Sequence, residues 1–369
     1  MRKIITITGF VLIFVLIGIH ISNAATINGV YAYNGVFDSR TGKINPSILS
    51  NPSVDGFVAY FGWSDIEPKK GVYDWKQVDD FISQAESVNK KVAIAIRPGR
   101  SAPDWVYEAG AKSIPFVWSF SYGLPYCQIV SIPVPWDSVY LSKWTDFIKA
   151  FGARYDSNLT ISHIEASGIS YNTPETDLPS TDVPESINNG QCMSKNYVSE
   201  WQAVGYTRTK IENAWNQIAD AWNSAFPDKP WGPLLVPGGF PRLDENGNII
   251  QWSAKDYQIT KYILDNGVKN YGARFVGQTN GLSDFYVFPD LSPVSKQIST
   301  GYQTLWFATN DPVCKMNNNI SPCDAEKVLK KTVKDGINAD AKFIEIYDVD
   351  ILNPSLSKII SRAHLKLVK

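Results

Sequence analysis

Residues 54–110 read VDGFVAYFGWSDIEPKKGVYDWKQVDDFISQAESVNKKVAIAIRPGRSAPDWVYEAG, and this stretch decides the fold. Gly56–Trp63 and Lys91–Arg97 are short apolar runs with the composition of buried strands. Between them, the apolar residues of 75–88 recur at spacings of three and four, which predicts an amphipathic helix with one buried face. The stretch is therefore predicted to form a strand, a helix and a second strand.

The same alternation of strand and helix continues in both directions along the chain. A doubly wound open sheet usually has a glycine-rich turn after its first strand, which Asn34-Gly35-Val36-Phe37 does not supply, so that fold is the alternative. Eight strands with intervening helices predict instead an α/β chain folded as a (β/α)8 TIM barrel of typical size. The six further predicted strands are Asn28–Tyr33, Ile161–Ser167, Gly232–Pro237, Arg274–Thr279, Tyr302–Ala308 and Lys342–Tyr347.

Helical spacing of apolar residues recurs in Leu141–Tyr155, Ile211–Trp222 and Ala325–Val333, and Asn353-Pro354 marks the start of a last helix. The longest connections follow the third, fourth and fifth predicted strands. In a barrel these connections lie at the C-terminal ends of the strands, where the active sites of such barrels are found.

The composition is that of a folded protein with a large core. Of the 369 residues, 44% are hydrophobic and 19% are charged, which excludes a disordered chain or a coiled coil. Proteins that bind nucleic acid usually carry more basic than acidic residues. The net charge of −1 therefore predicts that nucleic acid is not a partner. The 12 Trp, 18 Tyr and 17 Phe residues could form the flat walls of a site for sugar rings.

Histidine is scarce, and this limits the chemistry. The chain has only His20, His163 and His364, so a zinc site with several histidine ligands is excluded and no metal or cofactor is expected. Neither His163 nor His364 lies in a segment that resembles a serine or cysteine nucleophile site. Carboxylates are therefore the expected catalytic groups.

The N-terminus has the pattern of an export signal. Arg2 and Lys3 precede an apolar run from Ile4 to Ile19, and Ser22-Asn23-Ala24 offers small residues at a cleavage site. Residues 1–24 are predicted to be a signal peptide and residues 25–369 a single barrel domain, secreted or periplasmic. An uncleaved membrane anchor is the alternative. After cleavage no stable membrane insertion is expected, because no later stretch is long and apolar enough.

The four cysteines form an even set, which in an exported chain suggests two disulfides. Cys314 and Cys323 bracket a short Asn-rich loop and are the predicted pair. Cys127 and Cys192 would then pair with each other, although four cysteines allow three connectivities.

The stretch 54–110 resembles the second and third βα units of clan A glycoside hydrolases, notably the family 42 β-galactosidases. The resemblance implies a barrel whose C-terminal face binds a saccharide. In that pattern the side chains of Glu67 and Asp65 mostly shape the loop, whereas Trp63 and Arg97 end strands and are candidates for binding. The residues that carry the resemblance are Trp63, Ile66-Glu67-Pro68, Gly71, Tyr73-Asp74-Trp75, Pro103 and Trp105.

The resemblance also implies a catalytic pair, from which this sequence departs. In clan A the general acid/base is a Glu at the end of the fourth strand, normally after an Asn, and the nucleophile is a Glu that ends the seventh strand. Here the fourth unit, 163–175, has no Asn-Glu pair, and the seventh, 301–311, has no Glu.

Three glutamates remain as candidates for a pair of catalytic carboxylates. Glu175 follows the fourth strand and is the candidate general acid/base. Glu345 lies in the eighth strand, where it shares a face with Phe343 and Tyr347, and is the candidate for the second carboxylate. Glu165, which shares an inward face with His163, is held in reserve.

The sequence thus predicts an exported glycoside hydrolase that cleaves O-glycosidic bonds of a saccharide by paired-carboxylate chemistry. A non-catalytic carbohydrate-binding barrel is the alternative. The sequence predicts no particular oligomeric state. The candidate substrate-binding residues are Trp63, Arg97, Tyr171, Asn172, Gln278, Asn280 and Trp306.

Overall fold

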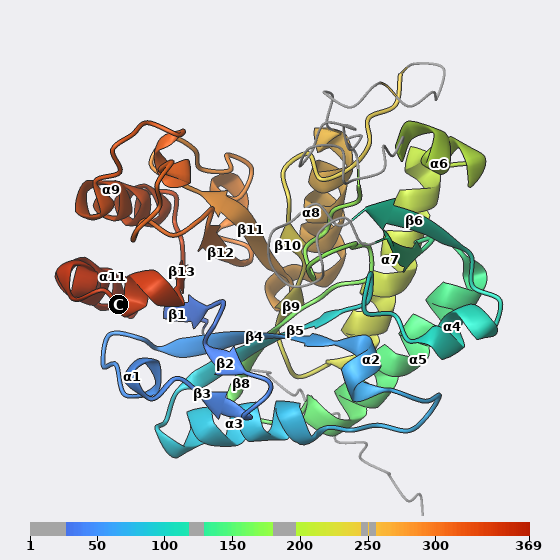
Figure 1. The fold of residues 1–369 in the computed structure, drawn as a ribbon, viewed down its shortest axis with the longest axis horizontal. Helices are drawn as coiled ribbons and strands as arrows, with labels where there is room; N and C mark the ends of the chain where they lie inside the picture. The colour runs from blue at the N-terminus through green and yellow to red at the C-terminus, as the bar shows by residue number, and fades with distance from the viewer. Residues whose placement is uncertain (1–26, 118–128, 180–196, 245–249, 251–255) are drawn as a thin grey trace, which may run out of the picture.

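The centre of the fold is a parallel sheet that curls into a barrel (Figure 1). The computed structural model describes residues 27–117, 129–179, 197–244, 250 and 256–369. In spatial order its strands are β1 (Gly29–Tyr33), β4 (Gly56–Gly62), β5 (Lys91–Arg97), β8 (Ile161–Glu165), β9 (Trp231–Gly232), β10 (Leu234–Leu235), β11 (Val276–Leu282), β12 (Ser299–Thr304) and β13 (Phe343–Tyr347).

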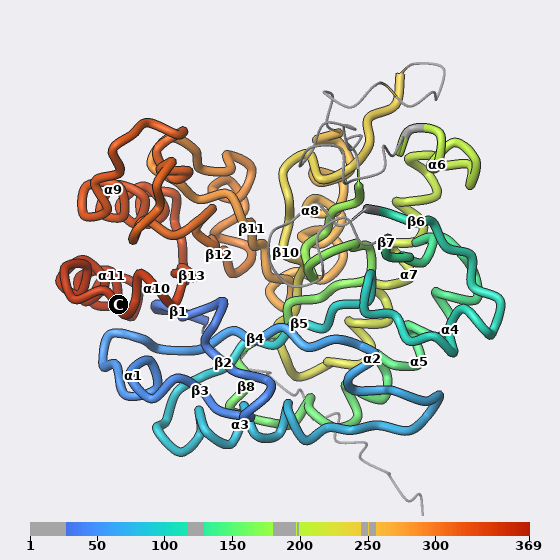
Figure 2. The backbone as a smooth tube through the Cα atoms, in the orientation of Figure 1, coloured from blue at the N-terminus to red at the C-terminus, as the bar shows by residue number. Residues whose placement is uncertain are grey.

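The barrel closes through a short fifth strand made of two pieces. β9 pairs with β8, and β10, one residue further along, pairs with β11. The first and last strands also pair, with Tyr31 opposite Glu345, so β1 and β13 lie side by side although they are at opposite ends of the chain (Figure 2). Because β9 and β10 occupy one position in the ring, the described residues form the eight strands of the predicted (β/α)8 barrel.

All eight predicted strands are present, and two are shifted along the chain. The seventh was predicted over Tyr302–Ala308, but β12 ends at Thr304. The apolar residues that follow it leave the sheet, and Trp306 packs against Tyr347 at the mouth of the barrel. The sixth was predicted to end at Thr279, whereas β11 continues to Leu282 with an irregular register after Thr279.

Helices cover the outside of the barrel. The Tyr257–Tyr271 helix was not predicted; Asp256 caps it by accepting a hydrogen bond from the backbone of Gln258. The other long helices follow the predicted periodicities. The helices are α1 (Pro46–Leu49), α2 (Trp63–Ile66), α3 (Lys76–Ser87), α4 (Asp104–Glu108), α5 (Ser138–Tyr155), α6 (Tyr197–Ala203), α7 (Arg208–Ala225), α8 (Tyr257–Tyr271), α9 (Ala325–Asn338), α10 (Asp348–Ile351) and α11 (Ser357–Leu367).

Strand alternation divides the core into two parts. Ile344 and Ile346 of β13 pack outward among the helices, while Phe343 and Tyr347 belong to a separate cluster inside the barrel. Glycine makes room for the rings inside: a Cβ on Gly301 would lie 2.0 Å from the ring of Phe343. The inner cluster comprises Ile27, Tyr31, Tyr33, Val58, Ala93, Val276, Phe343 and Tyr347.

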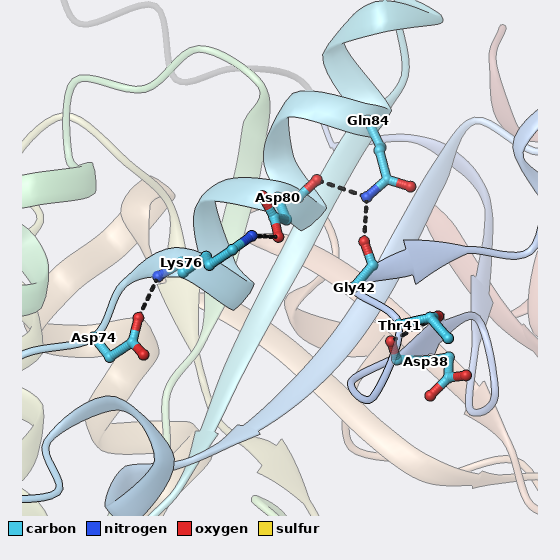
Figure 3. Close-up of polar contacts among 7 residues, drawn as sticks. All are labelled: Asp38, Thr41, Gly42, Asp74, Lys76, Asp80 and Gln84. Carbon is cyan, nitrogen blue, oxygen red and sulfur yellow. Dashed lines mark hydrogen bonds and ion pairs between the residues drawn. The ribbon is translucent and has the colours of Figure 1, made fainter.

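The hairpin of β2 (Phe37–Asp38) and β3 (Lys43–Ile44) is held against α3 by one side chain. Gln84 Nε2 donates to the carbonyl of Gly42 at 2.8 Å and to that of Asp80 at 2.9 Å (Figure 3). On the same helix Lys76 Nζ lies 2.5 Å from Asp80 Oδ2 (Figure 3). That exposed ion pair contributes little to stability. The side-chain amide of Gln84 is therefore the more important polar contact between the hairpin and α3.

A second hairpin, β6 (Ser113–Val117) with β7 (Ile129–Pro133), follows α4. The predicted disulfide between Cys314 and Cys323 is confirmed, with its Cα atoms 4.8 Å apart. Cys127, Cys192 and the predicted signal peptide lie outside the described residues. Of the helices that the structure describes, none has the length and apolar character needed to span a bilayer.

Candidate functional site

The side chain of Glu345 lies inside the barrel and is held by two amides. Gln278 of β11 donates to its Oε1 at 2.5 Å, and Gln303 of β12 donates to its Oε2 at 3.0 Å. All three side chains are buried. Strand alternation sends them inward from neighbouring strands, since Gln303 is directly opposite Glu345 in the β12–β13 register. Both carboxylate oxygens are therefore fixed in position by neutral donors.

Glu165 of β8 faces Glu345 across the barrel. One carboxyl oxygen of each lies within 4.8 Å of the other, and both residues are fully buried. Burial and the charge of Glu345 raise the pKa of Glu165 well above its ordinary value. Burial also raises the pKa of Glu345, to about 7, although hydrogen bonds from Glu165, Gln303 and Gln278 oppose the rise. Above about pH 7, where Glu345 is ionised, these shifts favour a single proton on the pair, held by Glu165.

His163 lies on the same inner face of β8 as Glu165, two residues before it, and its ring stays neutral. Its ring packs against Phe343 at 4.9 Å and edge-on to Tyr31 at 5.9 Å, and burial lowers its pKa to about 3. The Ser162 hydroxyl donates to the carbonyl of Val92 and lies 2.9 Å from His163 Nδ1. Because the Ser162 hydroxyl donates to Val92, its oxygen can accept from Nδ1–H, and the other side of the ring interacts with the side chain of Gln278.

Among the described residues, His163, Glu165 and Glu345 form a cluster that could hold a metal ion. Each offers one ligand atom, and the three atoms lie within 4.8 Å of one another. The same cluster is also stabilised by a proton on Glu165, because a proton removes the repulsion between the two carboxylates. The raised pKa of Glu165 favours the proton.

Glu175 joins this group from the loop that follows β8. It is half-buried, and Thr173 Oγ1 donates to its Oε2 at 2.9 Å. Burial raises its pKa, while hydrogen bonds from Asn280 and Thr173 lower it. Its charge in turn raises the pKa values of Glu165 and Glu345. The three glutamates singled out in the sequence thus act on one another electrostatically.

Tyr60 connects the carboxyl cluster to the mouth of the barrel. Its hydroxyl accepts a hydrogen bond of 2.7 Å from Gln303, which leaves its own proton free to donate. Burial raises the pKa of Tyr60 well above 10, and the charges of Glu165 and Glu345 raise it further. It therefore remains protonated near neutral pH.

Trp63 does not have the position that a ligand-binding residue needs. It is fully buried, and its indole nitrogen donates to Glu67 Oε2 at 2.8 Å. Its ring packs against Trp144 and Trp105 on the helix side of the barrel. The side chain that follows β4 points outward because the chain turns directly into α2. Trp63 is therefore part of the core between strands and helices.

The other predicted binding residues lie around the mouth or just below it. Tyr171 is half-buried and meets Phe116 edge-on at 5.4 Å. Asn172 is nearly buried, and its carbonyl accepts a hydrogen bond from Arg100 Nε at 3.1 Å.

The remaining predicted binding residues come from other strands. One face of the Trp306 ring is covered by Lys315 Nζ, 3.5 Å from the ring centre. Arg97 ends β5, Asn280 contacts Glu175, and Gln278 is buried with Glu345.

Two residues of the site were not proposed from the sequence. Gln303 was placed in a strand without a role, and Tyr60 was treated only as part of a strand. Strand alternation could have found both, because Tyr60 shares a face with Val58 of the inner cluster and Gln303 is opposite Glu345.

Comparison with known proteins bears on the barrel fold and on one segment of the sequence. Residues 52–116 match the model of glycoside hydrolase family 42, described as beta-galactosidase. The match includes the stretch from which the resemblance was stated, and that resemblance is confirmed. It covers less than a fifth of the chain. No curated protein sequence matches the chain.

Solved structures resemble the whole barrel at low sequence identity. The catalytic domain of beta-amylase from Paenibacillus polymyxa aligns with 94% of this chain and 100% of its own, at 11% identity and a TM-score of 0.53. A psychrophilic family 10 endo-beta-1,4-xylanase covers 93% of this chain and 96% of its own, at 12% identity and a TM-score of 0.46. An exo-beta-1,4-mannosidase from Opitutaceae bacterium strain TAV5 covers 91% and 55%, at 10% identity and a TM-score of 0.44. The likeness to beta-amylase shows the shared barrel fold.

Proposed function

We propose that this protein hydrolyses O-glycosidic bonds of a saccharide, with Glu175 as general acid/base and Glu345 as the second carboxylate. The observation that carries the proposal is the convergence of Glu165, Glu175 and Glu345 from three separate segments into one electrostatically coupled site. Glycosidases commonly cleave with two carboxyl groups, of which one protonates the leaving oxygen and the other attacks carbon or activates water.

The hydrogen bonds of Glu345 support its role as the ionised member. A nucleophile or general base must be deprotonated, and donors to both oxygens favour the charged form. In this role Glu165 is a positioning residue that stays protonated and donates to Glu345.

The environment of Glu175 supports its role as the acid. It is the one glutamate of the three that is not fully buried, so a glycosidic oxygen could reach it. Its raised pKa favours the protonated form that a general acid needs.

One observation favours a second candidate, a barrel that binds carbohydrate without cleaving it. The resemblance implies a nucleophilic Glu at the end of the seventh strand, and the side chain that β12 sends to this site is Gln303. In such a protein the buried Glu165–Glu345 pair would serve the structure of the barrel.

The two candidates are separated by a panel of aryl glycosides and polysaccharides, assayed with the wild type and with Glu345→Gln and Glu175→Gln. Glu86→Gln, an exposed change on α3, is the matched control. A hydrolase loses turnover by orders of magnitude in the first two variants and not in the control. Binding without turnover in the wild type would establish the second candidate, and no binding of any saccharide would reject both.

We also propose that the chain is exported, with residues 1–24 removed as a signal peptide. The Cys314–Cys323 disulfide supports this, because such bonds persist in oxidising compartments. The intact mass of protein secreted by its own host gives the cleavage site directly, and an uncleaved N-terminus would contradict the proposal.

A further inference from the structure

Arg97 is a cation at the mouth of the barrel with which none of the described residues forms an ion pair. It is the last residue of β5, opposite Gly62, and it lies on the same side of the strand as Ala93 of the inner cluster. Its Nε is buried without a hydrogen-bond partner. Asp65 and the Tyr60 hydroxyl lie near enough to act on it electrostatically, and within the described ranges no carboxylate forms an ion pair with it.

The other half-buried arginines are all partnered. Arg100 donates to the carbonyl of Asn172, and Arg208 donates to the carboxylate of Asp256. Arg274 donates to two backbone carbonyls, those of Asn223 and Phe226. Burying a charge without a partner costs free energy, so such a group usually acquires an acceptor within its own chain. A guanidinium keeps its proton even where burial lowers its pKa. Because none of the described residues supplies an acceptor for Arg97 Nε, a bound ligand can supply it.

The neighbours of Arg97 indicate where a ligand group that accepts from it would lie. Its charge and the Tyr60 hydroxyl act on each other, and that hydroxyl is one hydrogen bond from Gln303, which in turn holds Glu345. A ligand group bound by Arg97 would thus belong to a sugar close to the carboxyl cluster. A neutral sugar would leave the guanidinium without a counter-charge, whereas the fork of N–H donors matches a carboxylate or a sulfate in geometry and charge.

We propose that Arg97 selects a saccharide bearing an anionic substituent, a uronic acid carboxylate or a sulfate ester, on the sugar bound at the barrel mouth. This rests on the proposed function and narrows its substrate class. The cation also offsets the repulsion that an anionic sugar would meet from Glu175 and Glu345.

Binding is measured by titration calorimetry on the full chain with aryl glycosides of glucose, galactose and mannose, their matched uronides and their 6-sulfates. The wild type is expected to bind at least one anionic sugar about 10- to 100-fold more tightly than its neutral match. Arg97→Gln should abolish that preference and Arg97→Lys should keep part of it. Arg362→Gln, which removes an exposed charge on α11, should leave the preference intact. Preference for the uronide or for the sulfate identifies which anion is bound.

The outcomes separate this inference from the proposed hydrolysis. Turnover of neutral glycosides without any anionic preference overturns the role of Arg97 alone. Anionic preference without turnover overturns the hydrolase alone, and absence of binding overturns both. Thermal unfolding supplies a second measurement. Because Arg97 has no ion-pair partner among the described residues, Arg97→Gln should raise the melting temperature or leave it unchanged. A marked fall would show that the residue is half of a structural pair and would overturn the inference.

Discussion

Gln303 Nε2 donates to Glu345 Oε2 at 3.0 Å across two neighbouring strands of the barrel, and it also donates to the Tyr60 hydroxyl at 2.7 Å. The resemblance implies a catalytic Glu at the end of the seventh strand, and the amide of Gln303 occupies that place on β12. This amide donates a hydrogen bond to Glu345 of the next strand, β13. A change at Gln303 therefore separates the two candidate functions.

Gln303→Glu places a second negative charge beside Glu345. If Glu345 is the working carboxylate, the change raises its pKa further, removes one of its donors and lowers kcat/KM at neutral pH by about 10- to 1,000-fold. If the barrel lost its nucleophile at this position, the same change should create turnover on aryl glycosides. Gln202→Glu, an exposed change on α6, is the control and should alter neither.

The stability of the folded protein should fall as the pH rises. Glu345 has a pKa of about 7 in the folded state against an ordinary value of 4.5, so the folded chain binds the proton more tightly. The unfolded chain therefore holds fewer protons between pH 4.5 and 7, and the free energy of unfolding decreases across that window, by on the order of 3 kcal/mol from this group.

Urea unfolding from pH 4 to 8 measures this dependence. The groups that face Glu345 are Glu165, Glu175, Tyr60, Tyr31 and His163. Glu165 and Glu175 also have raised pKa values and act in the same direction. Glu345→Gln should therefore reduce the slope without removing it. A wild-type stability that rises from pH 5 to 7 would contradict the buried, partly protonated cluster.

Glu67 should be important for stability and not for turnover. Its two oxygens accept from the Trp63 indole and from the backbone N–H of Gly71, both at 2.8 Å. Glu67→Ala leaves these donors without an acceptor and should cost about 2–4 kcal/mol of unfolding free energy. Activity per folded molecule, measured below the melting transition, should stay within about twofold of the wild type. A specific loss of kcat would instead place Glu67 in the catalytic machinery.

The disulfide should stabilise the long segment between β12 and α9. Cys314 and Cys323 are nine residues apart, and closing a loop of that length in the unfolded chain is worth about 2–3 kcal/mol. The double change to serine should lower the melting temperature accordingly, and binding of saccharide should persist below the new transition. Intact mass of the wild type with and without reductant reports the bond; free thiols at both positions would refute it.

The sequence by itself determined the architecture and the identity of the three carboxyl groups. Short apolar runs that alternate with helical periodicities predict a barrel, because each element must bury one face. Strand alternation correctly oriented Glu345, with Phe343 and Tyr347 inside and Ile344 and Ile346 outside. The match over residues 52–116 adds a likeness of that segment to the family 42 beta-galactosidase model.

Only the tertiary structure decided what those groups meet. Gln278, Gln303 and Glu345 are separated by 25 to 67 residues along the chain, and the register of three strands brings their side chains together. The outward turn of Trp63 cannot be read from the sequence, and neither can the lack of a partner for Arg97 among the described residues. Residue type and periodicity report which face of an element is buried, whereas hydrogen bonds and charge pairs depend on distances of a few ångström between elements far apart in the chain.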